Sequence, residues 1–281
     1  MPRVAIVVDS ASDLSPEDSA RNGIAMVPLL VTFGSTEYRT GVDLSTDRFW
    51  EMMTAPGAPF PKTAACSPGD FQAAFQTAFD AGAESVVCIT VGGKLSATLK
   101  SAQIARDQMS GRDVRVIDSD TASYGFGLLA IMASEMSGAG AGADEIQAEV
   151  ERRKADSHLF VVLETLEYLK RGGRISAAQA AIGGILSVKP IITIEDGVVE
   201  TADKPRTRSK ARERLLELIT AKPIERAVVL TGKAADPDAF ATELAAQAGL
   251  AAGSIPVRAI GPSVGPHVGP GAYGAVVLYR S

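Results

Sequence analysis

His267 and Ser96 are the residues whose types and surroundings best suit chemistry in this chain. His267 is one of only two histidines in 281 residues, and it lies in the stretch 261–272, where four of twelve residues are Gly and three are Pro. Glycine lets backbone N–H groups approach a ligand closely and proline fixes φ, so this composition predicts a shaped loop rather than a helix or a long strand. The loop either holds the imidazole for a function or is a proline-stiffened turn with an incidental histidine, and both interpretations stay open here.

Ser96 lies where a predicted strand, 85–91, passes through two glycines and enters a predicted helix, 97–109. The first N–H groups of a helix have no partners within the helix, and the helix dipole is positive at that end. Such a junction is typical of a site that binds an anion.

The sequence around Ser96 excludes two common catalytic motifs. In a Walker A loop, GxxxxGK[ST], Cys88 would have to be Gly and Leu95 would have to be Ser or Thr. In a nucleophile elbow, GxSxG, glycines would have to replace Lys94 and Thr98. We therefore interpret Ser96 first as a hydrogen-bond donor.

Strands and helices alternate up to residue 156, which predicts a Rossmann-like parallel sheet that positions the Ser96 junction. The predicted strands are 4–8, 24–33, 85–91 and 114–117, and the predicted helices begin after Ser15 and cover 68–81, 97–109, 124–137 and 144–156. A shorter helix is expected after the capping residues 43–47. The GxGxxG fingerprint is missing, so the sequence does not support dinucleotide binding.

The pattern changes at the strand 157–163, and we place a domain boundary there, between 1–157 and 158–281. The second half predicts a hairpin at 190–200 around Glu195-Asp196-Gly197, helices at 177–187, 207–220 and 236–248, and strands at 227–231, 255–260 and 275–279. We expect the last two runs to be neighbouring strands that flank the His267 loop. Helix 177–187 is made of small residues, so it either packs close to its neighbour or leaves room for an apolar ligand. The predicted fold is therefore α/β, with two domains, the second built on a mixed sheet.

Composition excludes several classes of function. Hydrophobic residues make up 46% of the chain and aromatic residues 5%, which suits helices packed on a largely parallel sheet. The net charge of −5 and a pI of about 5.2 argue against a nucleic-acid partner. No apolar stretch is long enough to span a membrane, and the N-terminus does not read as a signal peptide.

The cysteines and the second histidine have simple interpretations. Cys66 and Cys88 show no metal-binding spacing, so we expect two reduced thiols and a cytoplasmic protein. His158, at the start of a strand, has no acidic or cysteine partner nearby in the sequence and is interpreted as structural.

Nine motifs occur in an order that strongly resembles the DegV family, the bacterial fatty-acid-binding proteins, over essentially the whole chain. The motifs are Asp9-Ser-Ala-Ser-Asp13, Thr63 through Phe71, Leu95-Ser96-x-Thr98, Val116-Ile-Asp-Ser119, Thr165-Leu-Glu-Tyr-Leu-Lys-Arg-Gly-Gly-Arg-Ile-Ser176, Lys189-Pro190, Glu195-Asp-Gly197, Arg206-Thr-Arg208 and His267-x-Gly-Pro-Gly-Ala272.

The resemblance implies that a long-chain fatty acid lies in a tunnel between two domains, with its carboxylate at the domain junction. In this family the acid is presented to a separate fatty acid kinase, which uses ATP to make an acyl phosphate for phospholipid synthesis. The chain would then be a lipid-binding carrier subunit in the cytoplasm rather than an enzyme. It would need no cofactor and no metal, and its contact with a membrane would be transient.

Carried over by motif, the implied ligand-binding residues are Thr63, Ser96, Ala97, His267, Gly269, Arg206 and Arg208. Thr63 and Ser96 would donate from hydroxyls and Ala97 from its backbone, while His267 and Gly269 would belong to the facing loop. Such donors bind a carboxylate without a full buried countercharge beside the oxygen that accepts phosphate. Arg206 and Arg208 open a predicted helix, where cations oppose the dipole, so an anion or kinase contact explains them better than a structural role.

This chain also departs from the family pattern near the head group. Ala64 and Ala65 replace polar residues, Gly92-Gly93 replaces a common Ser-Ser, Ala97 replaces a common Gly, and Val268 replaces a common Thr. The resemblance therefore implies a thinner polar network than is usual, and it leaves the chain length and saturation of the acid open.

Two other functions remain as alternatives. Ser96 as nucleophile and His267 as base would make an esterase-type hydrolase, although neither a nucleophile elbow nor an acidic residue in the His267 loop supports it. A lipid-responsive regulator that acts through a protein partner fits the same residues.

Overall fold

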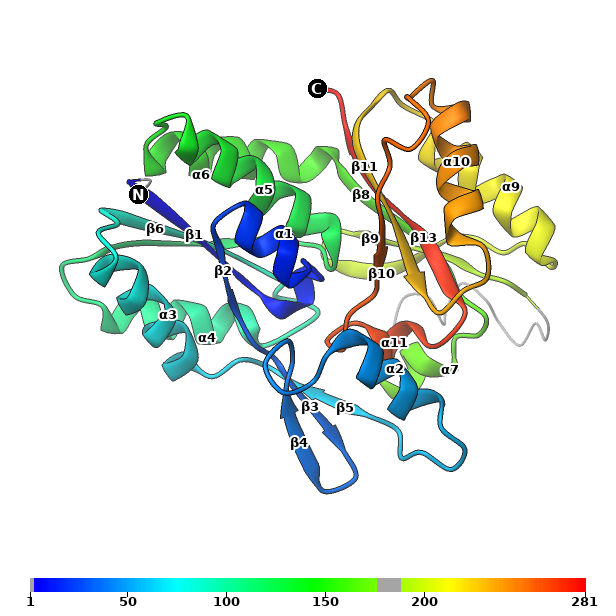
Figure 1. Ribbon diagram of the computed structural model, residues 1–281, viewed down its shortest axis with the longest axis horizontal. Coiled ribbons are helices and arrows are strands. Elements are labelled where there is room, and N and C mark those ends of the chain that lie inside the picture. Colours follow the sequence, from blue (N-terminus) through cyan, green and yellow to red (C-terminus); the bar gives the residue numbers. More distant parts are fainter. Residues whose placement is uncertain (1–2, 176–187) are drawn as a thin grey trace.

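A computed structural model describes residues 3–175 and 188–281 of the chain (Figure 1). The predicted helix 177–187, and with it the question of whether its small residues leave room for a ligand, lies outside the described residues. The described chain builds a four-stranded sheet, a six-stranded sheet and a three-stranded sheet, with helices between and around them.

The four-stranded sheet is parallel throughout and has the order β2-β1-β6-β7. Its strands are β1 (Val4–Asp9), β2 (Ile24–Val27), β6 (Ser85–Thr90) and β7 (Asp113–Asp118). The two central strands, β1 and β6, carry runs of Val and Ile buried on both faces, which is typical of a parallel sheet covered by helices, and the predicted Rossmann-like sheet is confirmed.

Helices cover both faces of this sheet (Figure 1). They are α3 (Pro68–Asp80) and α4 (Thr98–Gln108) on one face, and α5 (Tyr124–Gly138) and α6 (Ala143–Arg153) on the other. Helix α3 confirms the helix predicted over 68–81; it begins with a capping box at Ser67 and buries Phe71, Phe75 and Phe79. Helix α5 also packs on β8 and β13 of the six-stranded sheet, which explains why it is apolar almost all round.

The six-stranded sheet is mixed, as predicted, and has the order β10-β9-β8-β13-β11-β12. Its strands are β8 (Ser157–Val162), β9 (Ile191–Glu195), β10 (Val198–Asp203), β11 (Ile224–Gly232), β12 (Val257–Ala259) and β13 (Ala272–Tyr279). Helices α9 (Arg208–Ile219) and α10 (Pro237–Gln247) pack on it. The prediction that 255–260 and 275–279 are neighbouring strands is wrong, because β11 lies between β12 and β13 and hydrogen-bonds with both.

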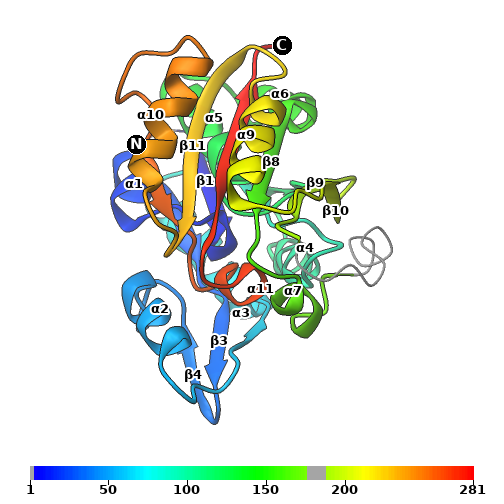
Figure 2. The ribbon, with the colours of Figure 1, turned by 90° about the vertical axis from the view of Figure 1, so that its right-hand side faces the viewer.

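The three-stranded sheet was not predicted, and it corrects the expected strand 24–33. That run divides at Pro28, which has no N–H to donate to a sheet, into β2 and β3 (Leu30–Phe33). Strand β3 pairs with β4 (Thr36–Arg39) and with β5 (Lys62–Ala64), which carries Thr63. Figure 2 shows β3 and β4 projecting below the rest of the molecule together with α2 (Thr46–Thr54).

The stretch around His267 contains one turn of helix, α11 (Gly265–Val268), so the expectation of a loop without helix is wrong. Pro266 stands in the first turn, where the missing N–H would have no partner in any helix. Short helical elements also occur at α1 (Pro16–Arg21), α7 (Glu167–Arg171), Ser10–Ser12 and Lys154–Asp156. Helix α7 packs against α11.

The domain ranges 1–157 and 158–281 stay a prediction, although β8, the first strand of the six-stranded sheet, begins at this boundary. Within the residues that the structure describes, no helix has the length and apolar character needed to cross a membrane. Cys66 and Cys88 are buried free thiols, in agreement with the prediction.

Candidate functional site

A cavity of about 80 Å3 lies beyond the carboxyl ends of three strands of the parallel sheet, where open α/β sheets bind their ligands. It lies between that sheet and elements of the second half of the chain. The described residues that line it are Ala11, Leu29, Thr63, Val91, Leu95, Ser96, Ala122, Leu169, Arg174, Ile192, Val199, Ser263, Val264, His267 and Val268. Three of the predicted site residues, Thr63, Ser96 and His267, therefore share one cavity.

The lining is mostly apolar and the polar groups are few. Aliphatic side chains such as Leu29, Val91, Leu169 and Ile192 come from four different segments of the chain. A volume of about 80 Å3 holds a head group, whereas sites for larger organic ligands span roughly 300 to 1,000 Å3.

His267 contacts Thr63 at the wall of the cavity. The Nε2 atom of His267 lies 3.2 Å from the Oγ1 atom of Thr63. The Nδ1 atom is buried and has no hydrogen-bond partner among the described residues. We assign the ring proton to Nε2, because a proton on Nδ1 would be a buried donor without an acceptor. In this tautomer Nε2 donates to Thr63, whose own hydroxyl proton is then free for a ligand.

The imidazole of His267 is neutral at pH 7. Burial, followed by the nearby positive charge of Arg174, lowers its pKa from the usual 6.5 to about 4. A neutral ring can accept or donate one hydrogen bond at Nε2, but it does not supply a positive charge to an anion. Among the described residues that line the cavity, Arg174 supplies the positive charge.

Sequence reasoning missed Arg174 as a site residue. Its Nε donates to the carbonyl of Leu95 at 3.1 Å and its Nη1 to the carbonyl of Gly172 at 2.6 Å. Both acceptors are neutral, so its charge is available to an anion in the cavity. The signal was present, because Arg174 belongs to the Gly-Gly-Arg part of a family motif.

Ser263 was missed as well, although it lies in the predicted loop. Its Oγ is 3.0 Å from the Oγ of Ser10, and Ser10 in turn is 2.5 Å from the Oγ1 of Thr40. The three buried hydroxyls form one cluster, and Ser263 is its member at the cavity wall.

Ser96 and His267 line the same cavity but do not form a catalytic pair. The Oγ of Ser96 shares a hydrogen bond of 2.9 Å with the Oγ1 of Thr98, and His267 contacts Thr63 instead. In a serine hydrolase the base bonds the nucleophile and a carboxylate orients the base. Among the described residues no carboxylate bonds Nδ1 of His267, so the triad geometry is missing.

Ala97 lies outside the cavity, in an open pocket of about 590 Å3 beside it. The two pockets share Leu95, Ser96, Arg174 and Val199, so these four residues lie between the inner space and the outer one. The outer pocket also contains Lys94, whose Nζ donates to the carbonyl of Asp196 at 2.7 Å.

The other three predicted site residues lie apart from the cavity. Gly269 has φ +76°, and a Cβ there would lie 2.2 Å from the ring of Tyr168, so packing accounts for this glycine. Arg208 forms an ion pair of 3.0 Å with Glu164, which also binds Lys189. Arg206 is exposed. These arginines can meet a partner at the surface, but they do not line the cavity.

The structure explains part of the departure from the family pattern at Gly92-Gly93, where a Ser-Ser pair is common. A Cβ on Gly93 would lie 2.6 Å from Leu99 Cδ2 and 2.9 Å from Asp118 Oδ2, so a serine does not fit without a shift. The N–H of Gly93 donates to Asp118 instead, at 3.0 Å. Ala64 and Ala65 do not line the cavity, and Val268 contributes only apolar surface to it.

No group of three or more metal-binding side chains gathers in the part of the chain that the structure describes. The donors in the cavity are hydroxyls, an imidazole and a guanidinium, which suit an anion such as a carboxylate rather than a metal ion.

Comparisons with known proteins agree with this fold along the whole chain. The model of the DegV family, described as uncharacterised proteins, matches residues 3–280. A DegV domain-containing protein of Caldanaerobacter subterraneus subsp. tengcongensis is 35% identical over 280 residues, which cover 98% of either chain.

Solved structures are similar over the same length. A DegV family protein from Thermus thermophilus, described by its fatty acid binding, has a TM-score of 0.90 and 34% identity, with 99% of this chain and 100% of the other covered. A stearic-acid-binding protein from Eubacterium ventriosum has a TM-score of 0.88 and 28% identity, with 99% and 98% covered. The family model matches nearly the whole chain and a relative is 35% identical over 98% of its length, and the chain therefore belongs to the DegV family.

Proposed function

We propose that this protein binds a long-chain fatty acid between its two α/β halves, with the carboxylate in the cavity of Thr63, Ser96 and His267. The observation that carries the proposal is the composition of that cavity. A few donors and one guanidinium face a space that is otherwise aliphatic. This combination suits a small anionic group attached to an apolar chain. Solved relatives from Thermus thermophilus and Eubacterium ventriosum are described as binding fatty acids, which supports the same ligand here.

The carboxylate would receive hydrogen bonds from the hydroxyls of Thr63 and Ser96, and Arg174 would supply the positive charge. A charged acceptor makes such bonds worth roughly 1.5 to 3 kcal/mol each. His267 would hold Thr63 in place through Nε2 and keep its hydroxyl directed at the ligand.

We further propose that the protein is a cytoplasmic carrier that presents the acid to a separate fatty acid kinase. In that reaction a carboxylate oxygen would attack the γ-phosphorus of ATP held by the kinase, and ADP would leave as acyl phosphate forms. The outer pocket beside Ala97 and Arg174 supports this role as a carrier. It adjoins the head-group cavity and is open, so a kinase could approach the carboxylate from that side. A lipid-responsive regulator would bind the same ligand but would not support this transfer.

The alternative hydrolase has less support. Ser96 bonds Thr98, and His267 bonds Thr63 and has no carboxylate partner among the described residues. We expect neither the wild-type protein nor His267→Ala to cleave a p-nitrophenyl acyl ester. Cleavage by wild type with a pH profile of a single basic group, abolished in His267→Ala or Ser96→Ala, would contradict the carrier proposal.

The direct test is lipid extraction of the purified protein followed by mass spectrometry, together with titration of delipidated protein with palmitate and with oleate. We expect a long-chain acid in the extract and uptake of at least one added acid. The proposal would be contradicted if the protein contained no long-chain acid and took up neither palmitate nor oleate. Acyl phosphate formation with ATP and the kinase of the same bacterium then separates a carrier from a regulator.

A further inference from the structure

The helical turn that carries His267 cannot hold its own shape. Helix α11 spans only Gly265–Val268. Isolated helices shorter than about 12 to 15 residues are marginal in water because the first turn is costly to form. The position of His267 must therefore be imposed by contacts from outside α11.

Three buried side chains from the first 50 residues bind the segment that leads into α11. The Nε1 of Trp50 donates to the carbonyl of Ile260 at 2.9 Å, and the N–H of Gly261 donates to Oδ1 of Asp13 at 3.0 Å. The Oγ of Ser10 is 3.0 Å from the Oγ of Ser263. Residues 260, 261 and 263 are thus bound by side chains that lie more than 200 residues away in the sequence.

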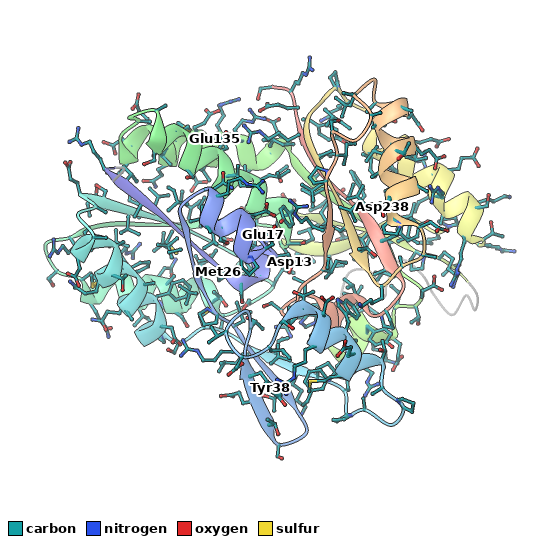
Figure 3. All side chains as sticks on the ribbon, viewed as in Figure 1. Asp13, Glu17, Met26, Tyr38, Glu135 and Asp238 are labelled. Carbon is teal, nitrogen blue, oxygen red and sulfur yellow. The ribbon has the colours of Figure 1, made fainter. Side chains whose placement is uncertain are left out.

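Asp13 and Trp50 are themselves buried and make further contacts. Asp13 has a left-handed backbone, φ +56°, and its second carboxylate oxygen accepts from the hydroxyl of Ser123 at 2.6 Å. Figure 3 shows Asp13 near the centre of the molecule, next to α1. Trp50 is 1% exposed and packs at 5.0 Å, ring centre to ring centre, on Phe49. Each therefore offers a fixed point to the segment that it binds.

Packing leaves this segment little freedom to move. A Cβ on Gly265, the first residue of α11, would lie 2.4 Å from the ring of Phe49 and 3.3 Å from that of Trp50. A Cβ on Gly261 would lie 2.6 Å from Oδ1 of Asp13. Both glycines are needed for close approach, so the turn lies directly on Trp50 and Asp13.

We propose that Trp50 and Asp13 are positioning residues for His267, which hold its helical turn at Ile260 and Gly261 so that the imidazole faces Thr63. The contact between His267 and Thr63 is 3.2 Å long, near the upper limit for such a bond. A small displacement of α11 therefore breaks it. The positioning role concerns the free protein, and only its effect on affinity rests on the proposed fatty acid site.

The test follows the side chain of His267 by nitrogen-15 NMR in Trp50→Phe and Asp13→Ala. Trp50→Phe keeps an aromatic ring under α11 but removes the N–H donor. His158 is the only other histidine, so its signals are an internal reference on β8. The matched control is Ser137→Ala, which removes another buried hydrogen bond, from Ser137 Oγ to the carbonyl of Val4 at 2.6 Å, away from the cavity.

We expect Trp50→Phe and Asp13→Ala to shift the His267 signals and to move the pKa of His267 toward its ordinary value, while the His158 signals stay unchanged. In the control Ser137→Ala, the signals of both histidines should stay unchanged. Asp13→Asn, which keeps an acceptor for the N–H of Gly261, should restore the wild-type His267 signals. The affinity for palmitate should fall about tenfold in Trp50→Phe, equivalent to about 1.4 kcal/mol.

Unchanged His267 signals in a folded Trp50→Phe, with a loss of thermal stability like that of Ser137→Ala, would overturn the proposal. If Asp13→Ala does not fold, the comparison of Trp50→Phe with Ser137→Ala decides alone. If the His267 signals shift but the wild-type protein contains no long-chain acid and binds neither palmitate nor oleate, the positioning role stands and the proposed function fails.

Discussion

The imidazole of His267 hydrogen-bonds the hydroxyl of Thr63 at 3.2 Å, although 204 residues separate them in the sequence. His267 comes from α11 in the second half of the chain, and Thr63 comes from β5 of the small three-stranded sheet. The contact therefore joins two parts of the fold at the wall of the cavity, and it allows the role of each residue to be tested separately.

Thr63→Val should weaken palmitate binding about tenfold, because it removes the hydroxyl but keeps the shape of the side chain. Thermal stability should change little, since Thr63 is only partly buried. The measurement is a palmitate titration beside the control Thr77→Val, whose hydroxyl bonds Ala73 within α3. Equal affinities in wild type and Thr63→Val would place the carboxylate elsewhere.

Ser96→Ala should also weaken binding, by roughly 1.5 to 3 kcal/mol, because a hydroxyl donor to a charged acceptor is lost. The fold should survive, since Ser96 is only partly buried and the backbone donors of α4 remain. Isothermal titration with palmitate and circular dichroism check the two statements. A folded variant that binds as tightly as wild type would exclude Ser96 from the head-group site.

Gly172→Ala should displace the ring of His267. The added Cβ would lie 2.2 Å from Nδ1 of His267 and 3.1 Å from the carbonyl of Tyr168, while the φ of −76° at this position suits alanine. We expect a loss of about 1 to 3 kcal/mol in the free energy of unfolding and a weaker lipid affinity. Gly138→Ala is the control, because a Cβ there meets nothing within 4 Å. If Gly172→Ala and Gly138→Ala have the same free energy of unfolding and the same lipid affinity, the added Cβ does not displace the His267 ring and the prediction is wrong.

The neutral state of His267 predicts a specific dependence of stability on pH. Its folded pKa of about 4 lies below the unfolded value near 6.5, so between these values the unfolded state binds the extra proton. The contribution of His267 to the free energy of unfolding therefore falls as the pH drops from 6.5 toward 4.

His267→Gln should not lose stability in this way. Between pH 7 and pH 5, the free energy of unfolding of wild type should therefore fall by about 2 kcal/mol more than that of His267→Gln. Urea unfolding of both proteins at pH 7, 6 and 5 measures it. Burial raises the pKa of Asp9 and of Asp13 to about 7, which gives the opposite dependence, but both are present in either protein and cancel in the difference. A difference that does not grow as the pH falls would contradict a buried neutral ring.

Arg206→Ala and Arg208→Ala should leave palmitate affinity nearly unchanged but impair acyl phosphate formation with the kinase. Neither arginine lines the cavity, and the exposed Arg208 forms an ion pair with Glu164 at 3.0 Å. The two activities are measured side by side, with Arg106→Ala on α4, a partly exposed arginine paired with Asp107, as the control. An equal loss of palmitate binding and of acyl phosphate formation would contradict the prediction that these arginines serve the kinase reaction and not lipid binding.

The sequence by itself determined the elements whose signals are local. The sequence predicted the strands that became β1, β6 and β7, and it predicted helices that begin after Ser15 and cover 68–81, where α1 and α3 form. The turn Glu195-Asp196-Gly197 predicted the hairpin of β9 and β10, which forms with positive φ at Asp196 and Gly197. These predictions succeed because the physical cause of each element lies within a few residues of it.

Only the tertiary structure decided which of these elements meet. Thr63, Ser96 and His267 share a cavity because β5, the start of α4 and α11 converge, and no local pattern encodes that convergence. For the same reason the sequence missed β4, paired 255–260 with the wrong neighbour and did not predict the turn of α11. A four-residue turn exists where distant side chains such as Trp50 and Asp13 bind its backbone, and contacts over more than 200 residues are visible only once the chain is folded.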